Sequence, residues 1–223
     1  MKQEAEQRSL DWYRARLGNF TGSRVGDLMV TERGGTGFGK TAMSYIYEVA
    51  AERSLHPIVV TWDEEFNRYL DVVDITNKAM RYGTEHEAEC RDMLEAELGV
   101  SIHERGSIKA EGIEHFASSP DGEFEMDEEK CCVEIKCPRP STYMEYKATI
   151  KTAADLKKVN AKYYWQCQSH MLVTGATRCV FATYCEFMTE PLHYIWVERN
   201  DDDQQMIRQR VTEANEIITK FQS

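Results

Sequence analysis

The stretch SSPDGEFEMDEEKCCVEIKCP, residues 118–138, places a charged pair inside an apolar run. Side chains alternate along a strand, so Glu134 and Lys136 share one face of it. The apolar side chains of Val133 and Ile135 point to the other face. A solvated edge pair is one interpretation, because strands often carry charges where one face of a sheet meets water. The other is a site at which the pair meets a further charge.

The residues before the apolar run indicate where that further charge lies. A turn-forming PDG at 120–122 and the polar, acidic stretch after it predict a hairpin. Its return strand would carry Glu134 back beside Asp121. Two carboxylates and a lysine would then converge, an arrangement that binds a hard divalent cation through oxygen ligands. On these residues alone, the solvated edge pair stays open.

The composition limits the size and class of the fold. With 223 residues, of which 42% are hydrophobic, the chain can bury one sizeable core, and we predict a single domain over 1–223. The first residues are polar, and no apolar run could span a bilayer, so we expect a soluble protein with no membrane partner. Seven cysteines without a CxxC pair indicate reduced thiols in a cytoplasm and argue against a zinc or iron–sulfur site.

The hydrophobic periodicity predicts an α/β fold, with a central mixed sheet flanked by helices. Helices are expected at residues 8–17, 23–30, 41–53, 76–98, 140–147, 160–174 and 202–221. Strands are expected at residues 100–109, 114–119, 131–137, 178–186 and 192–198. The last two strands are rich in β-branched and aromatic residues and would complete the sheet.

A second charge on the core side is expected in the helix at 76–98. Its apolar stripe runs through Cys90, Leu94 and Leu98. Continued back by one turn, the stripe reaches Glu87. A carboxylate buried without a partner is costly, so a cation should match it. Alternatively, the stripe drifts into solvent at this end of the helix.

Residues 34–41, GGTGFGKT, match the phosphate-loop pattern G-x-x-x-x-G-K-[ST]. Such a loop follows a buried strand, whereas the preceding GSRVGDLMVTER has the spacing of a short helix capped by Ser23. A P-loop ATPase therefore stays as an alternative function. We interpret the segment as a flexible glycine loop near a polyanion.

Charge is distributed unevenly along the chain. A net charge of −11 argues against a nucleic-acid partner, because phosphate binding is largely electrostatic. Residues 136–162, however, carry seven basic and two acidic side chains, a net +5 directly after the candidate site. We expect a basic patch there, with ordinary solvated lysines as the alternative.

Taken together, these motifs resemble a known family. SPDG followed by VEIKCP has the form of the PD-(D/E)xK nuclease signature, with GTEHE upstream and YYWQCQSHM downstream. The N-terminal DWYRARLGNFTGSRVGDLM is similar to a segment of the phage lambda exonuclease, or YqaJ-like viral recombinase, family. The resemblance covers most of the chain and implies a restriction-endonuclease-like core.

The resemblance also implies roles for particular residues around a metal. Asp121, Glu134 and the backbone carbonyl of Ile135 would hold Mg²⁺. Glu87 would be a further ligand, direct or through water, and two ions are expected per site, for which Mn²⁺ could substitute. Lys136 would position or deprotonate the attacking water.

Four more residues match family positions that act on the nucleophile or on DNA. Gln166 would support the nucleophile or the lysine. Arg16, Ser23 and Ser119 would contact a terminal 5′-phosphate. The glycine-rich loop and the extra cysteines depart from the family pattern, which leaves loop contacts with DNA open.

The activity implied by the resemblance is that of a Mg²⁺-dependent exonuclease. It would degrade one strand of double-stranded DNA from the 5′ end to 5′-mononucleotides, in phage-type homologous recombination. A homotrimeric ring, a single-strand annealing protein as partner and a bacterial cytoplasm are implied with it. A non-catalytic DNA-binding or annealing module is the remaining alternative.

Overall fold

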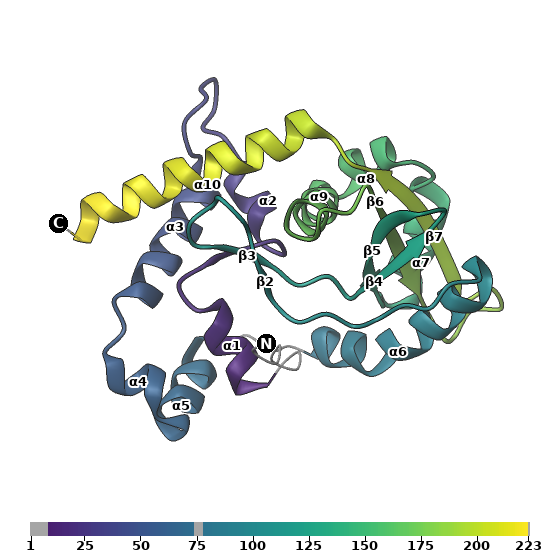
Figure 1. Ribbon diagram of the computed structural model, residues 1–223, viewed down its shortest axis with the longest axis horizontal. Helices are drawn as coiled ribbons and strands as arrows, with labels where there is room; N and C mark the ends of the chain where they lie inside the picture. The colour runs from purple at the N-terminus through teal and green to yellow at the C-terminus, as the bar shows by residue number, and fades with distance from the viewer. Residues whose placement is uncertain (1–8, 74–77, 223) are drawn as a thin grey trace.

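The computed structural model describes residues 9–73 and 78–222, with side chains from residue 86 onward in the second range (Figure 1). A mixed sheet of four strands lies at one end of the molecule, in the order β4–β5–β6–β7. The pairs β4–β5 and β6–β7 are antiparallel, and β5–β6 is parallel. These strands are β4 (Gly122–Met126), β5 (Glu129–Lys136), β6 (Arg178–Tyr184) and β7 (Leu192–Glu198).

Helices cover both faces of this sheet, which confirms the predicted α/β class. On one face, α6 (Lys78–Leu98) buries Cys90 and Leu94 against the apolar side chains of β5 and β6. On the other face, α9 (Ala161–Thr174) lies between the sheet and α10 (Asp201–Gln222), and Figure 1 shows it almost end-on. Because both neighbours of α9 are protein, side chains all round this helix are buried.

A smaller sheet joins the N-terminal region to the core. Its strand order is β1–β3–β2, with β1 parallel and β2 antiparallel to β3. The three strands are β1 (Phe20–Thr21), β2 (Ile108–Lys109) and β3 (Phe116–Ser118). The ends of β1 and β3 therefore leave the small sheet side by side, beside α9.

The remaining helices lie around these two sheets. They are α1 (Leu10–Arg16), α2 (Val25–Leu28), α3 (Lys40–Arg53), α4 (Pro57–Thr61), α5 (Asp63–Val73), α7 (Pro140–Thr149) and α8 (Ala153–Val159). The short helices α4 and α5 form an arm beside α1 in Figure 1. Within the described residues, no helix has the length and apolar character needed to cross a membrane.

Several elements differ from the sequence-based expectation. Helices α4, α5 and α8 and strands β1 and β4 were not predicted. In α8, Thr152 and Asp155 form a reciprocal capping box, a signal that was available in the sequence. The strand expected at 100–109 is wrong for most of its length, since only β2 and an isolated bridge between His103 and Glu123 form there.

The glycine-rich segment at 34–41 lacks the context of a phosphate loop. The helix α2 stands before it, where a buried strand is required. A Cβ added at Gly35 or Gly37 would lie 2.6 or 2.8 Å from Oε1 of Glu32, so a carboxylate occupies the inside of the loop. This acidic lining opposes phosphate binding. The loop is also held from outside, because Arg210 donates to the Thr36 carbonyl over 3.2 Å.

Candidate active site

The predicted hairpin is present, and it brings Asp121 beside the end of β5. Its turn lies at Asp127 and Glu128, where φ is +54° and +66°, rather than at PDG. The backbone N–H of Asp121 donates to the carbonyl of Val133 over 2.9 Å. The N–H of Ile135 donates to Oδ2 of Asp121 over 2.7 Å. The carboxylate is therefore fixed against the strand that carries Glu134.

Glu134 is a fully buried carboxylate with two cationic or donor partners. Its Oε1 forms an ion pair with Lys136, and its Oε2 lies 2.6 Å from Nε2 of His170. Burial alone would raise the pKa of Glu134, but Lys136 and the hydrogen bond from His170 outweigh it and lower that pKa. Glu134 is therefore ionised, and it shares a face of β5 with Lys136 as the alternation predicted.

Lys136 is held in its charged form. Burial opposes the charge, but Glu134 and Asp121 outweigh it and raise the pKa of Lys136 above its usual value. Its Nζ also lies 5.2 Å from the ring centroid of Tyr163. An ammonium that keeps its proton can orient a water molecule or balance negative charge, which favours positioning over proton abstraction.

The surroundings of Asp121, in contrast, favour the neutral form of its side chain. Burial raises its pKa well above the usual range, and the charges of Glu134 and Glu87 raise it further. Glu87 projects from α6 as a half-buried residue, one turn before the fully buried Cys90. Three acidic side chains therefore repel one another in a region partly shielded from solvent, and a bound cation would relieve that repulsion.

The donor set at this point fits an oxygen-preferring divalent cation such as Mg²⁺. Carboxylates of Asp121 and Glu134 and the carbonyl of Ile135 are hard oxygen donors of the kind that Mg²⁺ binds. Among the residues that the structure describes, no three His, Cys, Asp or Glu side chains form a ready-made metal-binding group. Lys136 balances the charge of Glu134 in this arrangement, and His170 lies within hydrogen-bonding distance of the same carboxylate.

The three residues expected at a 5′-phosphate lie together, although they come from distant parts of the sequence. Arg16 ends α1, Ser23 follows β1 and Ser119 follows β3. The Arg16 guanidinium donates to Oγ of Ser23 over 3.1 Å and to Oγ of Ser119 over 3.3 Å. It also stacks 4.2 Å above the ring of Trp12. Parallel pairing of β1 with β3 produces this meeting, because it sets their carboxyl ends side by side.

One functional candidate escaped the sequence analysis. His170, fully buried on α9, contacts Glu134, and its Nδ1 lies 2.8 Å from Oγ of Ser118. Tyr163, Gln166 and His170 follow one another at i, i+3 and i+7, so they occupy one face of the helix. Gln166, which was predicted, is buried on that face. The helical spacing of Tyr163 and His170 from Gln166 was the signal in the sequence that could have identified His170.

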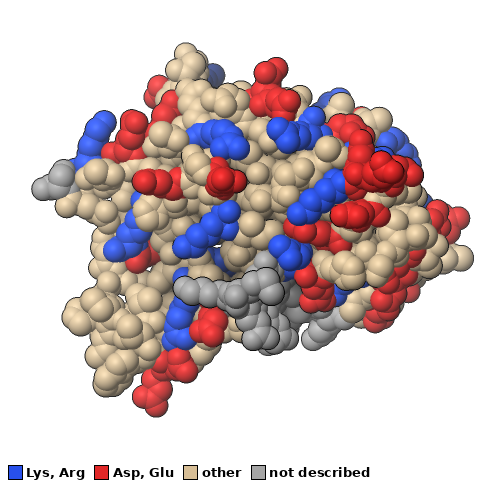
Figure 2. All heavy atoms as spheres, in the orientation of Figure 1, with Lys and Arg blue, Asp and Glu red and all other residues tan. Residues whose placement is uncertain are grey.

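The expected basic patch at 136–162 is largely neutralised. Four of its seven basic side chains form ion pairs, namely Lys136–Glu134, Lys147–Glu190, Lys157–Asp203 and Lys162–Asp27. Figure 2 shows basic and acidic side chains interspersed over one face of the molecule. The composition of the segment therefore overstated the charge that it presents to DNA.

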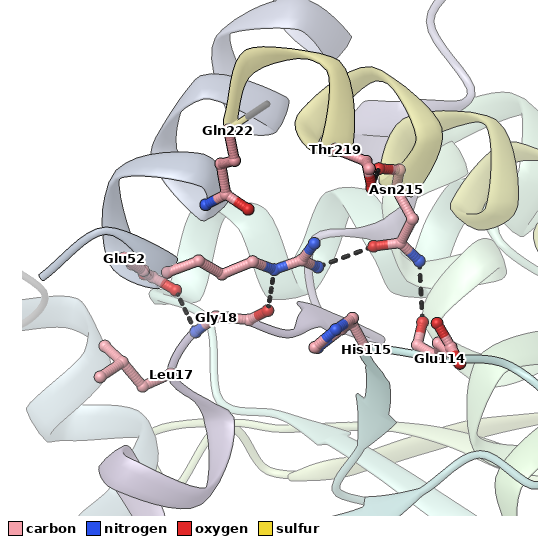
Figure 3. A pocket seen from close by; sticks show the side chains of 9 residues that line it. Leu17, Gly18, Glu52, Glu114, His115, Asn215, Thr219 and Gln222 are labelled. Carbon is pink, nitrogen blue, oxygen red and sulfur yellow. Dashed lines mark hydrogen bonds between the residues drawn. The ribbon is translucent and has the colours of Figure 1, made fainter.

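A polar pocket of about 400 Å³ lies behind the end of α1 and contains none of the predicted site residues (Figure 3). Arg53 lines it and donates to the Gly18 carbonyl and to Oδ1 of Asn215, each over 2.7 Å. The N–H of Gly18 donates to Glu52 over 2.8 Å. These bonds fix the chain immediately after Arg16, so the pocket lining supports the arginine from behind.

Comparisons with known proteins agree with this geometry. A family model of the YqaJ-like viral recombinase domain matches residues 11–177. An alkaline exonuclease from Laribacter hongkongensis, solved alone and in complex with dAMP, is 27% identical, with a TM-score of 0.75 over 95% of this chain and 93% of that one. No curated protein matches the chain.

A more distant structure extends the likeness of the fold. A phage-related exonuclease from Haemophilus somnus 129PT has a TM-score of 0.67 over 91% of this chain and 94% of its own, at 13% identity. Fold and acidic site thus define the class, an α/β protein with the restriction-endonuclease-like fold of exonucleases, as predicted. The chain belongs to the YqaJ-like viral recombinase domain family.

Proposed function

We propose that this protein is a Mg²⁺-dependent exonuclease that digests one strand of double-stranded DNA from its 5′ end. The observation that carries the proposal is the adjacency of two sites. The acidic centre of Asp121 and Glu134 lies next to an arginine–serine group. Of the consecutive residues Ser118 and Ser119, the first contacts His170, which contacts Glu134, and the second contacts Arg16. A nucleotide bound by its 5′-phosphate would present its next bond to the carboxylates. The Laribacter relative solved with dAMP supports a 5′-mononucleotide as the product.

The metal would be held by residues already brought together. Asp121, Glu134 and the carbonyl of Ile135 would be ligands, and Glu87 would complete the set directly or through water. When bound, Mg²⁺ supplies activation of water and neutralisation of charge on the phosphate oxygens. We propose two ions per site, with Mn²⁺ as a substitute, in a centre of the PD-(D/E)xK type.

The side chains of the protein would divide the remaining work. Lys136, charged and close to Glu134, would orient the attacking water and offset negative charge at the phosphate. Gln166 would support Lys136 or the water from the same face of α9. Arg16 would grip the terminal phosphate with two parallel hydrogen bonds, which a planar guanidinium favours.

Assembly and biological context follow the same proposal. We expect a homotrimeric ring that encloses DNA, working beside a single-strand annealing protein in phage-type recombination in a bacterial cytoplasm. Because the 136–162 segment is largely ion-paired, its three side chains without such a pair in the described residues, Arg139, Lys151 and Lys158, would be those available to phosphates. Light scattering at working concentration tests the trimer, and a monomer would reject it.

The test of the activity is incubation of linear duplex DNA with Mg²⁺ or EDTA, with and without ATP. Release of 5′-mononucleotides in Mg²⁺ alone, and none in EDTA, is the expected result. Duplex binding without product in Mg²⁺ would point instead to a DNA-binding or annealing module. Strict dependence on ATP would point to the ATPase.

A further inference from the structure

A second line of contacts runs behind Glu134, on the side away from Lys136. Oε2 of Glu134 lies 2.6 Å from Nε2 of His170, and Nδ1 of His170 lies 2.8 Å from Oγ of Ser118. All three side chains are essentially excluded from water, with exposed fractions of 0%, 0% and 1%. The contacts link α9, β5 and β3, three elements that are far apart in the sequence.

The chemistry of the groups fixes the direction of the first bond. An ionised carboxylate only accepts hydrogen bonds, so Nε2 of His170 is the donor to Glu134. The hydroxyl of Ser118 can donate or accept, and it therefore satisfies Nδ1 in either protonation state of the ring. Both ring nitrogens are engaged, and the plane of the imidazole is fixed.

The position of Ser118 is itself tightly set. A Cβ at Gly22 would collide with Oγ of Ser118 and would lie 3.1 Å from Cβ of Ser169. The backbone at Gly22 thus closes over the hydroxyl, which has little room to leave His170. Gly22 directly follows β1, and its N–H donates to the Ala117 carbonyl of β3 over 2.9 Å, so the small sheet holds this backbone in place.

We propose that His170 is a positioning residue, locked by Ser118, that holds Oε2 of Glu134 so that Oε1 alone faces Lys136 and a bound cation. The proposal rests on the metal centre of the proposed function, in which Glu134 is a ligand. Groups that orient metal ligands in this way are worth about 10- to 100-fold in metal affinity or activity. No contact of His170 with DNA is required.

A buried histidine could also serve only to satisfy a buried carboxylate. That role predicts a loss of stability without a selective change in the site. A positioning role predicts weaker metal binding and a lower kcat, with an unchanged KM for DNA ends, because Arg16 and its serines lie outside the line of contacts.

The experiment measures Mn²⁺ binding by electron paramagnetic resonance, together with kcat and KM in Mg²⁺. We expect Ser118→Ala, which removes a single oxygen, to weaken Mn²⁺ binding about 10-fold, and His170→Leu to weaken it about 10- to 100-fold. His170→Gln should recover most of the affinity, because its amide can still donate to Oε2. Ser169→Ala is the matched control, since this buried hydroxyl on α9 donates to the Trp165 carbonyl of its own helix over 2.9 Å.

The outcomes separate the two proposals. Mn²⁺ affinity within twofold of the wild type in Ser118→Ala and His170→Leu would overturn the positioning role and leave the proposed function intact. If His170→Leu does not fold, the positioning role is decided by the Mn²⁺ affinities of Ser118→Ala and His170→Gln, each compared with that of the control Ser169→Ala. A wild-type protein that binds Mn²⁺ but cuts no DNA would reject the proposed function alone, and one that binds no Mn²⁺ would reject both.

Discussion

Replacement of Arg16 by alanine is the sharpest test of how the protein would recognise a DNA end. The guanidinium is already aimed by Ser23 and Ser119 and stacked on Trp12, so little ordering is left for the bound state. A hydrogen bond to a charged group contributes about 1.5–3 kcal/mol, and a phosphate gripped by both arms of the arginine would gain about 3 kcal/mol or more. At 1.4 kcal/mol for each factor of ten, the loss corresponds to about 100-fold.

The assay compares duplexes with a 5′-phosphate and a 5′-hydroxyl end. Arg16→Ala should lose about 100-fold of the preference for the phosphorylated end, and both ends should be cut at similarly slow rates. Mn²⁺ binding should be unchanged. Arg16→Lys should be intermediate, because an ammonium keeps the charge but cannot form two parallel bonds.

Arg14→Ala is the matched control for this substitution. It removes an arginine from the same helix, but one that binds Asp63 and the Val60 carbonyl rather than the serines. Loss of stacking on Trp12 should cost Arg16→Ala only about 0.5–1 kcal/mol of stability. A wild-type ratio between the two substrates in Arg16→Ala would refute the role of Arg16 as phosphate anchor.

Three further outcomes are expected at the acidic centre. Asp121→Asn should reduce cleavage by orders of magnitude. In calorimetry, the wild type should be stabilised by metal by about 2.7 kcal/mol at 100 times Kd, or roughly 5–11 °C in Tm, and Asp121→Asn should lose most of that stabilisation. Lys136→Ala should cleave as poorly but bind Mn²⁺ normally, so a loss of Mn²⁺ affinity in titrations would contradict its role. The raised pKa of Asp121 makes its contribution to stability complete below about pH 4 and lost as the pH rises through that pKa. In EDTA, the wild-type Tm should therefore fall more than that of Asp121→Asn as the pH rises above about 4, and parallel curves would show that the pKa of Asp121 is not raised.

The acidic hairpin was predictable because its signals are local. Alternation along β5 placed Glu134 and Lys136 on one face, and the short connection implied that Asp121 would return beside them. The turn itself was misplaced, since Asp127 and Glu128 adopt positive φ without a glycine to announce it. Cross-strand pairing decided that conformation, and single residues do not encode it.

Other parts depended on contacts that the sequence does not display. His170 lies on a helix that is buried all round, so no apolar stripe distinguishes its functional face. The basic segment at 136–162 looked uncompensated because its partners, such as Asp27 and Asp203, are more than 40 residues away. Helix α4 was missed because Ile58, Val59 and Val60 favour a strand, whereas Pro57 at the first position and the His56 cap start a helix.

Because Ser118 and Ser119 are adjacent in the chain, they bear on the length of DNA that would be removed in each step. The Cα atoms of two consecutive residues are about 3.8 Å apart, whatever the rest of the chain does. One serine contacts the arginine that would hold the DNA end, and the other contacts the histidine behind the acidic centre. The distance between the two sites is therefore set by the single peptide unit that joins Ser118 to Ser119 at the end of β3. In the proposed enzyme, the length of each step would be a property of the backbone, and heat or salt that loosens loops would change the rate without changing the size of the product.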